Sequence, residues 1–149
     1  MISVEQEPKV IEEKWPEILA EALSYMKEKE WRKRLAASLV LADLLPNRTW
    51  ADIKDRFKDV FLGSLILLND DVESVKKSAT NLCKTIKRLT MKFANIYANN
   101  DIKELQEVLS LVVPMTIDEV IKSMNKTVKF WGVDLLFEIV KSSTQEKMY

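Results

Sequence analysis

Apolar side chains recur along this chain at intervals of three and four residues, the spacing that gathers them on one face of an α-helix. Short polar turns separate six such stretches, which predict helices over residues 9–27, 31–45, 49–68, 72–98, 102–124 and 127–141. Because proline lacks the amide hydrogen that a helix interior needs, Pro16 and Pro114 should bend the first and fifth helices, and Pro46 should end the second. Thr49 is the predicted N-cap of the third helix, since its hydroxyl can accept a hydrogen bond from the first turn.

One register recurs in the second, fourth and sixth of these helices. Each copy contains a small residue, which is Ala37, Ala79 or Gly132. The large apolar positions of the register are Val40, Leu41, Leu44, Val75, Leu82, Cys83, Ile86, Val128, Leu135, Leu136 and Ile139. We expect the small side chain to let the second helix of each pair lie close to a neighbouring helix.

This recurrence is typical of helical-pair repeats of the HEAT type. It predicts an all-α protein, a right-handed α-solenoid of about three HEAT-like antiparallel helix pairs, with repeats over residues 9–45, 49–98 and 101–141. All 149 residues would then form one segment, and neighbouring pairs must stack because a single pair cannot bury both of its faces. Solenoids of this kind present long surfaces to other macromolecules.

Composition argues against several classes of function. The chain has 0 histidines and 1 cysteine, so it lacks the commonest general base and metal ligand, and we expect no catalysis, metal or cofactor. The formal net charge is +0, which gives no electrostatic reason to expect nucleic-acid binding. The longest apolar stretch, residues 60–68, has about half of the ~20 residues that a membrane span needs. Cys83 should pack as a small apolar side chain, and one cysteine favours a reducing, intracellular compartment.

Two groups of residues are candidates for contact with a partner. Trp31, Arg32 and Arg34 follow the turn between the first two helices, and tryptophan and arginine are favoured at interfaces. The second group lies on the fourth helix and consists of Lys76, Lys77, Lys84, Lys87 and Arg88, in a basic strip that also includes Lys92. For both groups a simpler interpretation stays open, in which Trp31 covers the core and the basic residues form an ordinary solvated helix surface.

Two stretches resemble one particular family. The first comprises residues 28–34 (EKEWRKR) and 41–45 (LADLL), and the second comprises residues 70–79 (DDVESVKKSA) and 84–86 (KTI). They are similar to a segment in the C-terminal part of the proteasome adaptor and scaffold protein family, whose members are very large HEAT-repeat proteins. The chain departs from the family pattern at Lys33, where an apolar residue is usual.

The resemblance implies a non-enzymatic scaffold segment that belongs to a much longer solenoid in the cytoplasm and nucleus. Members of the family bind the assembled proteasome, link its core and regulatory particles, and take part in proteasome quality control. The isolated segment is then expected to self-associate through uncapped ends. An alternative is a tubulin-binding array of the TOG type or another protein-interaction solenoid, because such arrays also use tryptophan and basic residues in their turns.

Overall fold

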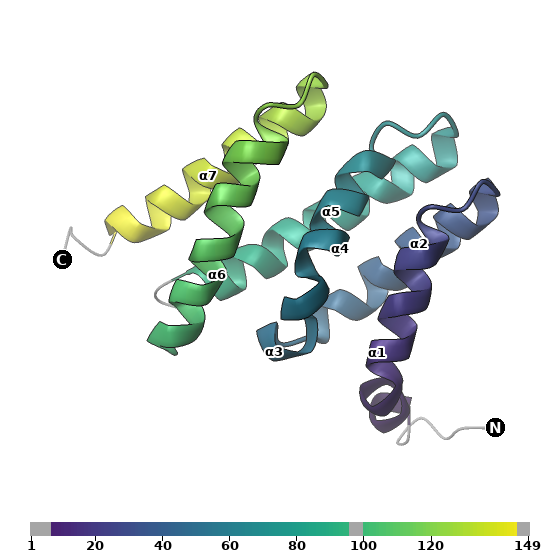
Figure 1. The fold of residues 1–149 in the computed structure, drawn as a ribbon, viewed down its shortest axis with the longest axis horizontal. Coiled ribbons are helices and arrows are strands. Elements are labelled where there is room, and N and C mark those ends of the chain that lie inside the picture. Colours follow the sequence, from purple (N-terminus) through teal and green to yellow (C-terminus); the bar gives the residue numbers. More distant parts are fainter. Residues whose placement is uncertain (1–6, 96–99, 146–149) are drawn as a thin grey trace. The chain divides into compact units, whose positions relative to one another are not determined.

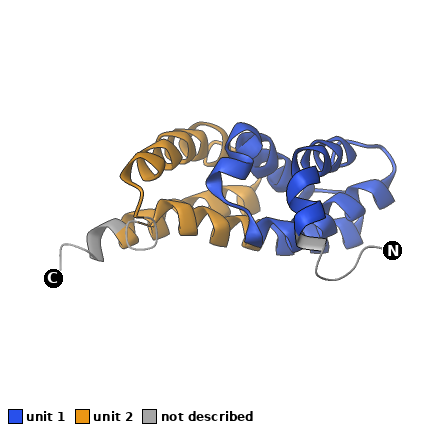
Figure 2. Ribbon diagram, turned by 90° about the horizontal axis from the view of Figure 1, so that it is seen from below, with its two compact units in different colours: residues 1–82 blue, residues 83–149 orange. Residues whose placement is uncertain are grey.

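The computed structural model describes residues 7–95 and 100–145, and these residues form helices and turns without a strand (Figure 1). The α-helices are α1 (Glu7–Tyr25), α2 (Trp31–Leu44), α3 (Trp50–Ile53), α4 (Phe57–Leu67), α5 (Glu73–Ala94), α6 (Ile102–Met115) and α7 (Lys126–Gln145). The fold is therefore all-α, with its helices packed in the manner of helical repeats, as the sequence predicted. The chain divides into two compact units, residues 1–82 and 83–149, and the division falls inside α5 (Figure 2).

The first unit contains α1 to α4 and the beginning of α5. Helix α1 packs against both α2 and α4. The core is rich in aromatic rings: Phe57 lies 5.3 Å from Trp50 and 5.7 Å from Phe61, measured between ring centroids. The hydroxyl of Ser78 on α5 donates to that of Ser38 on α2 over 3.0 Å, so α2 and the beginning of α5 lie side by side.

The second unit contains the rest of α5 together with α6 and α7. Its buried residues include Ile86, Leu89, Val108, Val112, Leu135 and Ile139. The ammonium group of Lys87 on α5 binds the carboxylates of Asp134 and Glu138 on α7. These ion pairs link α5 to α7.

The prediction of one continuous third helix is wrong. The chain forms α3, a 3₁₀ turn over Lys54–Arg56 and then α4. The indole Nε1 of Trp15 donates to the carbonyl oxygen of Asp52 over 3.1 Å, and in an unbroken helix that oxygen would accept from the amide of Arg56. A side chain far away in the sequence therefore takes the place of a helical hydrogen bond.

The predicted cap of this region is confirmed. The Thr49 hydroxyl accepts from the Asp52 amide over 3.3 Å, and the Asp52 carboxylate accepts from the Thr49 amide over 3.0 Å. This reciprocal pair is a capping box, which satisfies two amides that the first helical turn leaves without partners.

Both prolines that were predicted to bend a helix lie inside one. Helix α1 runs through Pro16 without a break, and α6 runs through Pro114 to Met115. The irregularity follows Pro114, as a π-helical turn over Thr116–Val120 in which the amide of Ile121 donates to the carbonyl of Thr116. The fifth helical stretch consequently ends at Val120 instead of continuing to residue 124.

The other predicted boundaries lie close to the observed ones. Helix α2 ends at Leu44 and passes into a 3₁₀ turn that contains Pro46, and α5 ends at Ala94 instead of residue 98. The predicted end of that helix, at residues 96–98, lies outside the described residues.

The repeat register has a consistent place in α2, α5 and α7. Most of its positions are buried, namely Ala37, Leu41, Val75, Ala79, Leu82, Cys83, Ile86, Val128, Gly132, Leu135 and Ile139. Leu44 and Leu136 are half-buried, and Val40 is exposed. A Cβ atom built on Gly132 would lie only 2.5 Å from Cγ1 of Val120, so the π-helical turn rests directly on the α7 backbone.

Candidate functional site

Arg34 joins two turns of the first unit. Its guanidinium donates from Nε and Nη2 to the two carboxylate oxygens of Asp70 over 2.7 and 3.0 Å, and from Nη1 to the carbonyls of Glu28 and Lys29 over 2.9 and 2.8 Å. The Asp70 side chain is 7% exposed and the Arg34 side chain 17%. The hydrogen bond from Arg34 lowers the pKa of Asp70 and raises that of Arg34, against the opposing effect of desolvation.

Asp70 also accepts from the amide of Val72 over 3.0 Å, next to the start of α5. This hydrogen bond satisfies a backbone amide in the turn that leads into α5. The bidentate partner of the carboxylate, however, comes from another helix pair. Arg34 therefore has a structural role, and we leave it out of the contact surface proposed below.

Trp31 and Arg32 form a small exposed feature at the start of α2. The guanidinium carbon of Arg32 lies 4.6 Å from the centre of the Trp31 ring, within the range of a cation–π interaction. The Arg32 guanidinium also contacts the carboxylate of Glu30 over 3.2 Å, and Glu30 is the N-cap of α2. The Trp31 ring is half-buried and the Arg32 side chain is 72% exposed, so both groups can be reached from solvent.

The basic residues of α5 fall into two kinds. Lys76 contacts Glu73 over 3.9 Å, and Lys87 contacts Asp134 and Glu138, so both have carboxylate partners within the chain. The exposed cations of this helix for which the described residues provide no hydrogen-bond or ion-pair partner are Lys77, Lys84, Arg88 and Lys92. They lie near one face of the helix at intervals of seven and four residues. All four belong to the basic strip that the sequence indicated on this helix.

Sequence reasoning missed two exposed aromatic residues on α7. Phe130 is 70% exposed and Phe137 is 72% exposed. Relative to the small residue of the repeat, they occupy the same positions as Lys77 and Lys84 on α5. Aligning the three copies of the register beyond their buried positions would have shown that this face carries cations on α5 and phenylalanines on α7.

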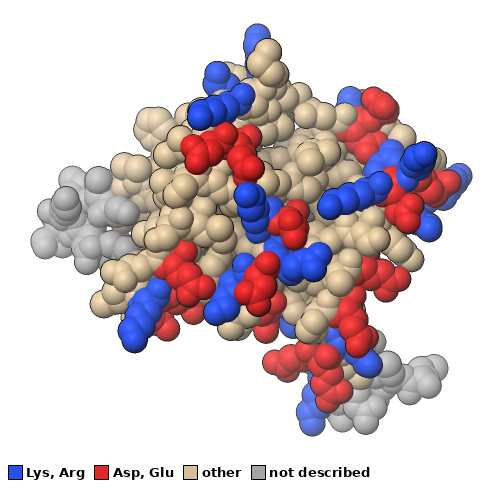
Figure 3. Space-filling model, viewed as in Figure 1, with Lys and Arg blue, Asp and Glu red and all other residues tan. Residues whose placement is uncertain are grey.

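Charge over the visible face of the molecule is mixed. In Figure 3, basic and acidic side chains alternate over the surface, without a large area of one sign. This distribution agrees with the formal net charge of +0. It favours local recognition by small groups of charges over long-range electrostatic attraction.

Cys83 is buried, and burial raises the pKa of its thiol to about 12. At neutral pH it is therefore a neutral thiol that packs as an apolar side chain. Within residues 7–95 and 100–145, no group of three or more His, Cys, Asp or Glu side chains is placed to hold a metal ion. No helix in the same part of the chain is long and apolar enough to cross a membrane.

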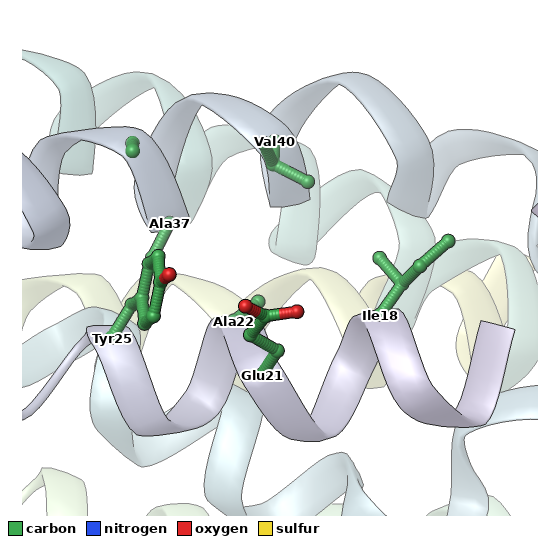
Figure 4. Close-up of a pocket in the computed structure, with 7 residues that line it drawn as sticks. Ile18, Glu21, Ala22, Tyr25, Ala37 and Val40 are labelled. Carbon is green, nitrogen blue, oxygen red and sulfur yellow. The ribbon is translucent and has the colours of Figure 1, made fainter. Parts of the chain in front are cut away.

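A hollow of about 150 Å³ lies between α1 and α2. Its lining is largely apolar and consists of Ile18, Glu21, Ala22, Tyr25, Ala36, Ala37 and Val40. Figure 4 shows Tyr25 and Ile18 rising from α1 on either side of the shorter Ala22, with Val40 coming from α2 above them. A second hollow, of about 380 Å³, lies beside Trp15 and is lined by charged residues that include Glu12, Asp55 and Arg56.

Comparison with known proteins gives one informative similarity. No protein-family model matches the chain, and no solved structure matches it. The chain is 27% identical over 128 residues to the human protein named "Proteasome adapter and scaffold protein ECM29". The similarity covers 85% of this chain and only 7% of that protein, so the chain spans a small part of the length of this relative.

Proposed function

We propose that the chain is a non-enzymatic scaffold segment of a proteasome-associated HEAT-repeat adaptor. The observation that carries this proposal is the similarity to the human proteasome scaffold protein, which extends over 85% of the chain. The helical-pair architecture supports it, because a scaffold needs stacked pairs with variable exposed faces and needs no catalytic site. As in that family, the parent protein would join the core and regulatory particles, support proteasome quality control, and work in the cytoplasm and nucleus.

The second unit offers the best contact surface for this role. Lys84 and Arg88 on α5 are exposed cations without a partner among residues 7–95 and 100–145, and Phe130 and Phe137 on α7 are exposed aromatic residues. The Lys87–Asp134 ion pair shows that the two helices run beside each other. Cations next to exposed phenylalanines fit a partner segment that carries both acidic and apolar side chains.

In the first unit, Lys77 on α5 and the stacked Trp31–Arg32 pair on α2 offer smaller contacts of the same chemical kind. Tryptophan and arginine are the residues most often found to dominate binding energy at protein interfaces. Arg32 and Lys77 are more exposed than Arg34, which is held by hydrogen bonds to Asp70.

The test is retention of purified proteasomes on the immobilised chain. We expect the wild-type chain to retain them and a variant with Lys77→Glu, Lys84→Glu and Arg88→Glu to lose most of that retention. The matched control reverses three other exposed lysines by Lys122→Glu, Lys126→Glu and Lys129→Glu, which changes the net charge equally. Equal retention by both variants would exclude the α5 face as the contact, and no retention by the wild-type chain would exclude a direct contact by this segment.

The alternative function is binding of tubulin. The stacked Trp31 and Arg32 at the start of α2 are the feature that favours it, because they lie just after the turn between α1 and α2. Retention of tubulin instead of proteasomes, and its loss on Trp31→Ala, would support the alternative. The turn before α5, by contrast, carries the acidic Asp70, whose carboxylate already accepts hydrogen bonds from Arg34.

A further inference from the structure

Two phenylalanines form an exposed row on α7. Phe130 is 70% exposed and Phe137 is 72% exposed, and they are seven residues apart, which places both on the same side of the helix. Because an α-helix rises about 1.5 Å per residue, their Cα atoms lie about 10.5 Å apart along its axis. Adjacent large apolar side chains on a surface mark a place where another macromolecule binds.

The exposure of this row does not depend on the position of α7 near the end of the sequence. In the repeat register, Phe130 and Phe137 correspond to Lys77 and Lys84 on α5. These lysines are exposed, although α5 contacts α2 in the first unit and α7 in the second. A further helical pair that stacked on α7 in the same way would therefore leave both phenylalanines exposed.

The spacing of the two rings suits one aromatic side chain placed between them. Ring centroids in favourable aromatic pairs are about 4.5–7 Å apart, so a ring in the middle of a gap of about 10.5 Å contacts both of its neighbours. The half-buried Val133 lies between Phe130 and Phe137 along the helix and adds an apolar surface beside the gap. The row therefore has the dimensions of a clamp for a single ring.

The side of the gap next to α5 is basic. In the second unit, α5 and α7 run in the same direction (Figure 1), and the ammonium group of Lys87 binds the carboxylates of Asp134 and Glu138. Lys84 lies one turn before this contact, about level with the gap, and Arg88 directly follows Lys87. Neither Lys84 nor Arg88 has a hydrogen-bond or ion-pair partner in the part of the chain that the structure describes, whereas the two carboxylates share Lys87. A partner that enters the gap thus meets two cations whose charge is not balanced locally.

We propose that Phe130 and Phe137 clamp one aromatic side chain of a partner protein, while acidic residues beside that side chain bind Lys84 and Arg88. The charge of this face selects the occupant, because unbalanced cations next to an apolar gap favour an acidic segment over a neutral or basic one. The clamp rests on the function proposed above and makes it more specific: the face formed by α5 and α7 receives a segment with one aromatic residue among acidic ones.

Binding of a labelled peptide, followed by fluorescence anisotropy, tests the clamp. The probe is a short peptide with one phenylalanine between glutamates, and we expect the purified chain to bind it more tightly than the same peptide with alanine in place of the phenylalanine. Phe130→Ala and Phe137→Ala should each weaken binding of the probe roughly two- to tenfold, the effect of losing one aromatic pair. Ile66→Ala is the matched control and should leave binding unchanged, because it shortens an apolar side chain that is 71% exposed on α4.

Reversal of charge on α5 tests the acidic part of the probe. A variant with Lys84→Glu and Arg88→Glu should lose the preference for the glutamate peptide over a peptide in which glutamines replace the glutamates. The control reverses two exposed lysines outside α5 and α7, by Lys103→Glu and Lys122→Glu, and should keep that preference. Both variants change the net charge by the same amount, so long-range attraction affects them equally.

The clamp is overturned if the wild-type chain binds the phenylalanine and alanine peptides equally, or if only one of the two phenylalanine substitutions weakens binding. A preference for glutamate that survives charge reversal on α5 would overturn it as well. Retention of proteasomes is a separate measurement. Retention that persists in a variant with both Phe130→Ala and Phe137→Ala would refute the clamp and leave the proposed function standing. Binding of the probe through both phenylalanines, by a chain that does not retain proteasomes, would do the reverse.

Discussion

Arg34 and Asp70 show how a charged pair can organise turns that are distant in the sequence. One guanidinium satisfies two carboxylate oxygens and two backbone carbonyls, which leaves little of its donor capacity for a partner. Removal of the arginine would leave a carboxylate of low exposure without its principal donor. Such a loss costs more than the loss of an exposed ion pair.

Arg34→Met should therefore lower the thermal midpoint of unfolding by several degrees at neutral pH. The control is Arg32→Met, which removes a 72% exposed guanidinium and should change the midpoint little. Thermal unfolding followed by circular dichroism measures both. An equal effect of the two substitutions would contradict the structural role of Arg34.

The effect of Arg34 should also depend on pH. The folded-state pKa of Asp70 lies below its ordinary value of 3.8, so its contribution to stability is complete above that value and is lost as the pH falls through the lower, folded-state pKa. The difference in stability between the wild-type chain and Arg34→Met should consequently shrink as the pH is lowered below 3.8. A difference that stays constant into strong acid would show that the methionine acts through packing instead of charge.

At the scale of the helices, the two glycines have opposite environments. A Cβ atom on Gly132 in α7 would lie 2.5 Å from Cγ1 of Val120, a stiff β-branched side chain on the π-helical turn. A Cβ atom on Gly63 in α4 would lie 3.2 Å from Cε of Met26, the flexible end of a side chain that can move aside. Replacement of glycine by alanine inside a helix gains ~1 kcal/mol of helix propensity, so the sign of each effect depends on the neighbour.

Gly132→Ala should destabilise the protein by about 1–3 kcal/mol, because the cost of overpacking exceeds the gain in helix propensity. Gly63→Ala is the matched substitution and should be neutral or stabilising by up to ~1 kcal/mol. Urea unfolding gives both free energies. Stabilisation by Gly132→Ala would mean that the π-helical turn does not lie against α7 as the structure shows.

At the scale of the whole molecule, α5 is the element common to both units. Its first part contributes Val75 and Leu82 to the core of the first unit, and its second part contributes Ile86 and Leu89 to the core of the second. A break in this one helix should therefore weaken both cores. A break elsewhere would affect only the unit that contains it.

Lys84→Pro should destabilise the protein by about 3 kcal/mol or more, because proline inside a helix removes a hydrogen bond and collides with the preceding turn. The control is Ile102→Pro, at the first position of α6, where proline is tolerated and where the isoleucine is 69% exposed. Thermal unfolding of both units is measured by tryptophan fluorescence and circular dichroism. Similar midpoints for the two variants would contradict a continuous α5 across the boundary.

The sequence by itself determined the all-α class, the helix pairs and most of the buried positions. The reason is local: apolar residues at helical spacing, the Thr49 cap and the small residues of the register each act within a few neighbours along the chain. The candidate cations on α5 could also be found, since their spacing alone places them near one helix face.

Only the tertiary structure decided which of these side chains are available to a partner. Arg34 and Lys87 are basic residues at the starts or faces of helices, as Arg32 and Lys84 are, and the sequence does not distinguish them. In the structure, however, Arg34 and Lys87 each contact a carboxylate that lies tens of residues away along the chain. In the same way, the Trp15 indole donates to the carbonyl of Asp52, where the predicted third helix is interrupted. Contacts between distant residues depend on how helices stack, and helical periodicity specifies the buried face of a helix without specifying what covers it.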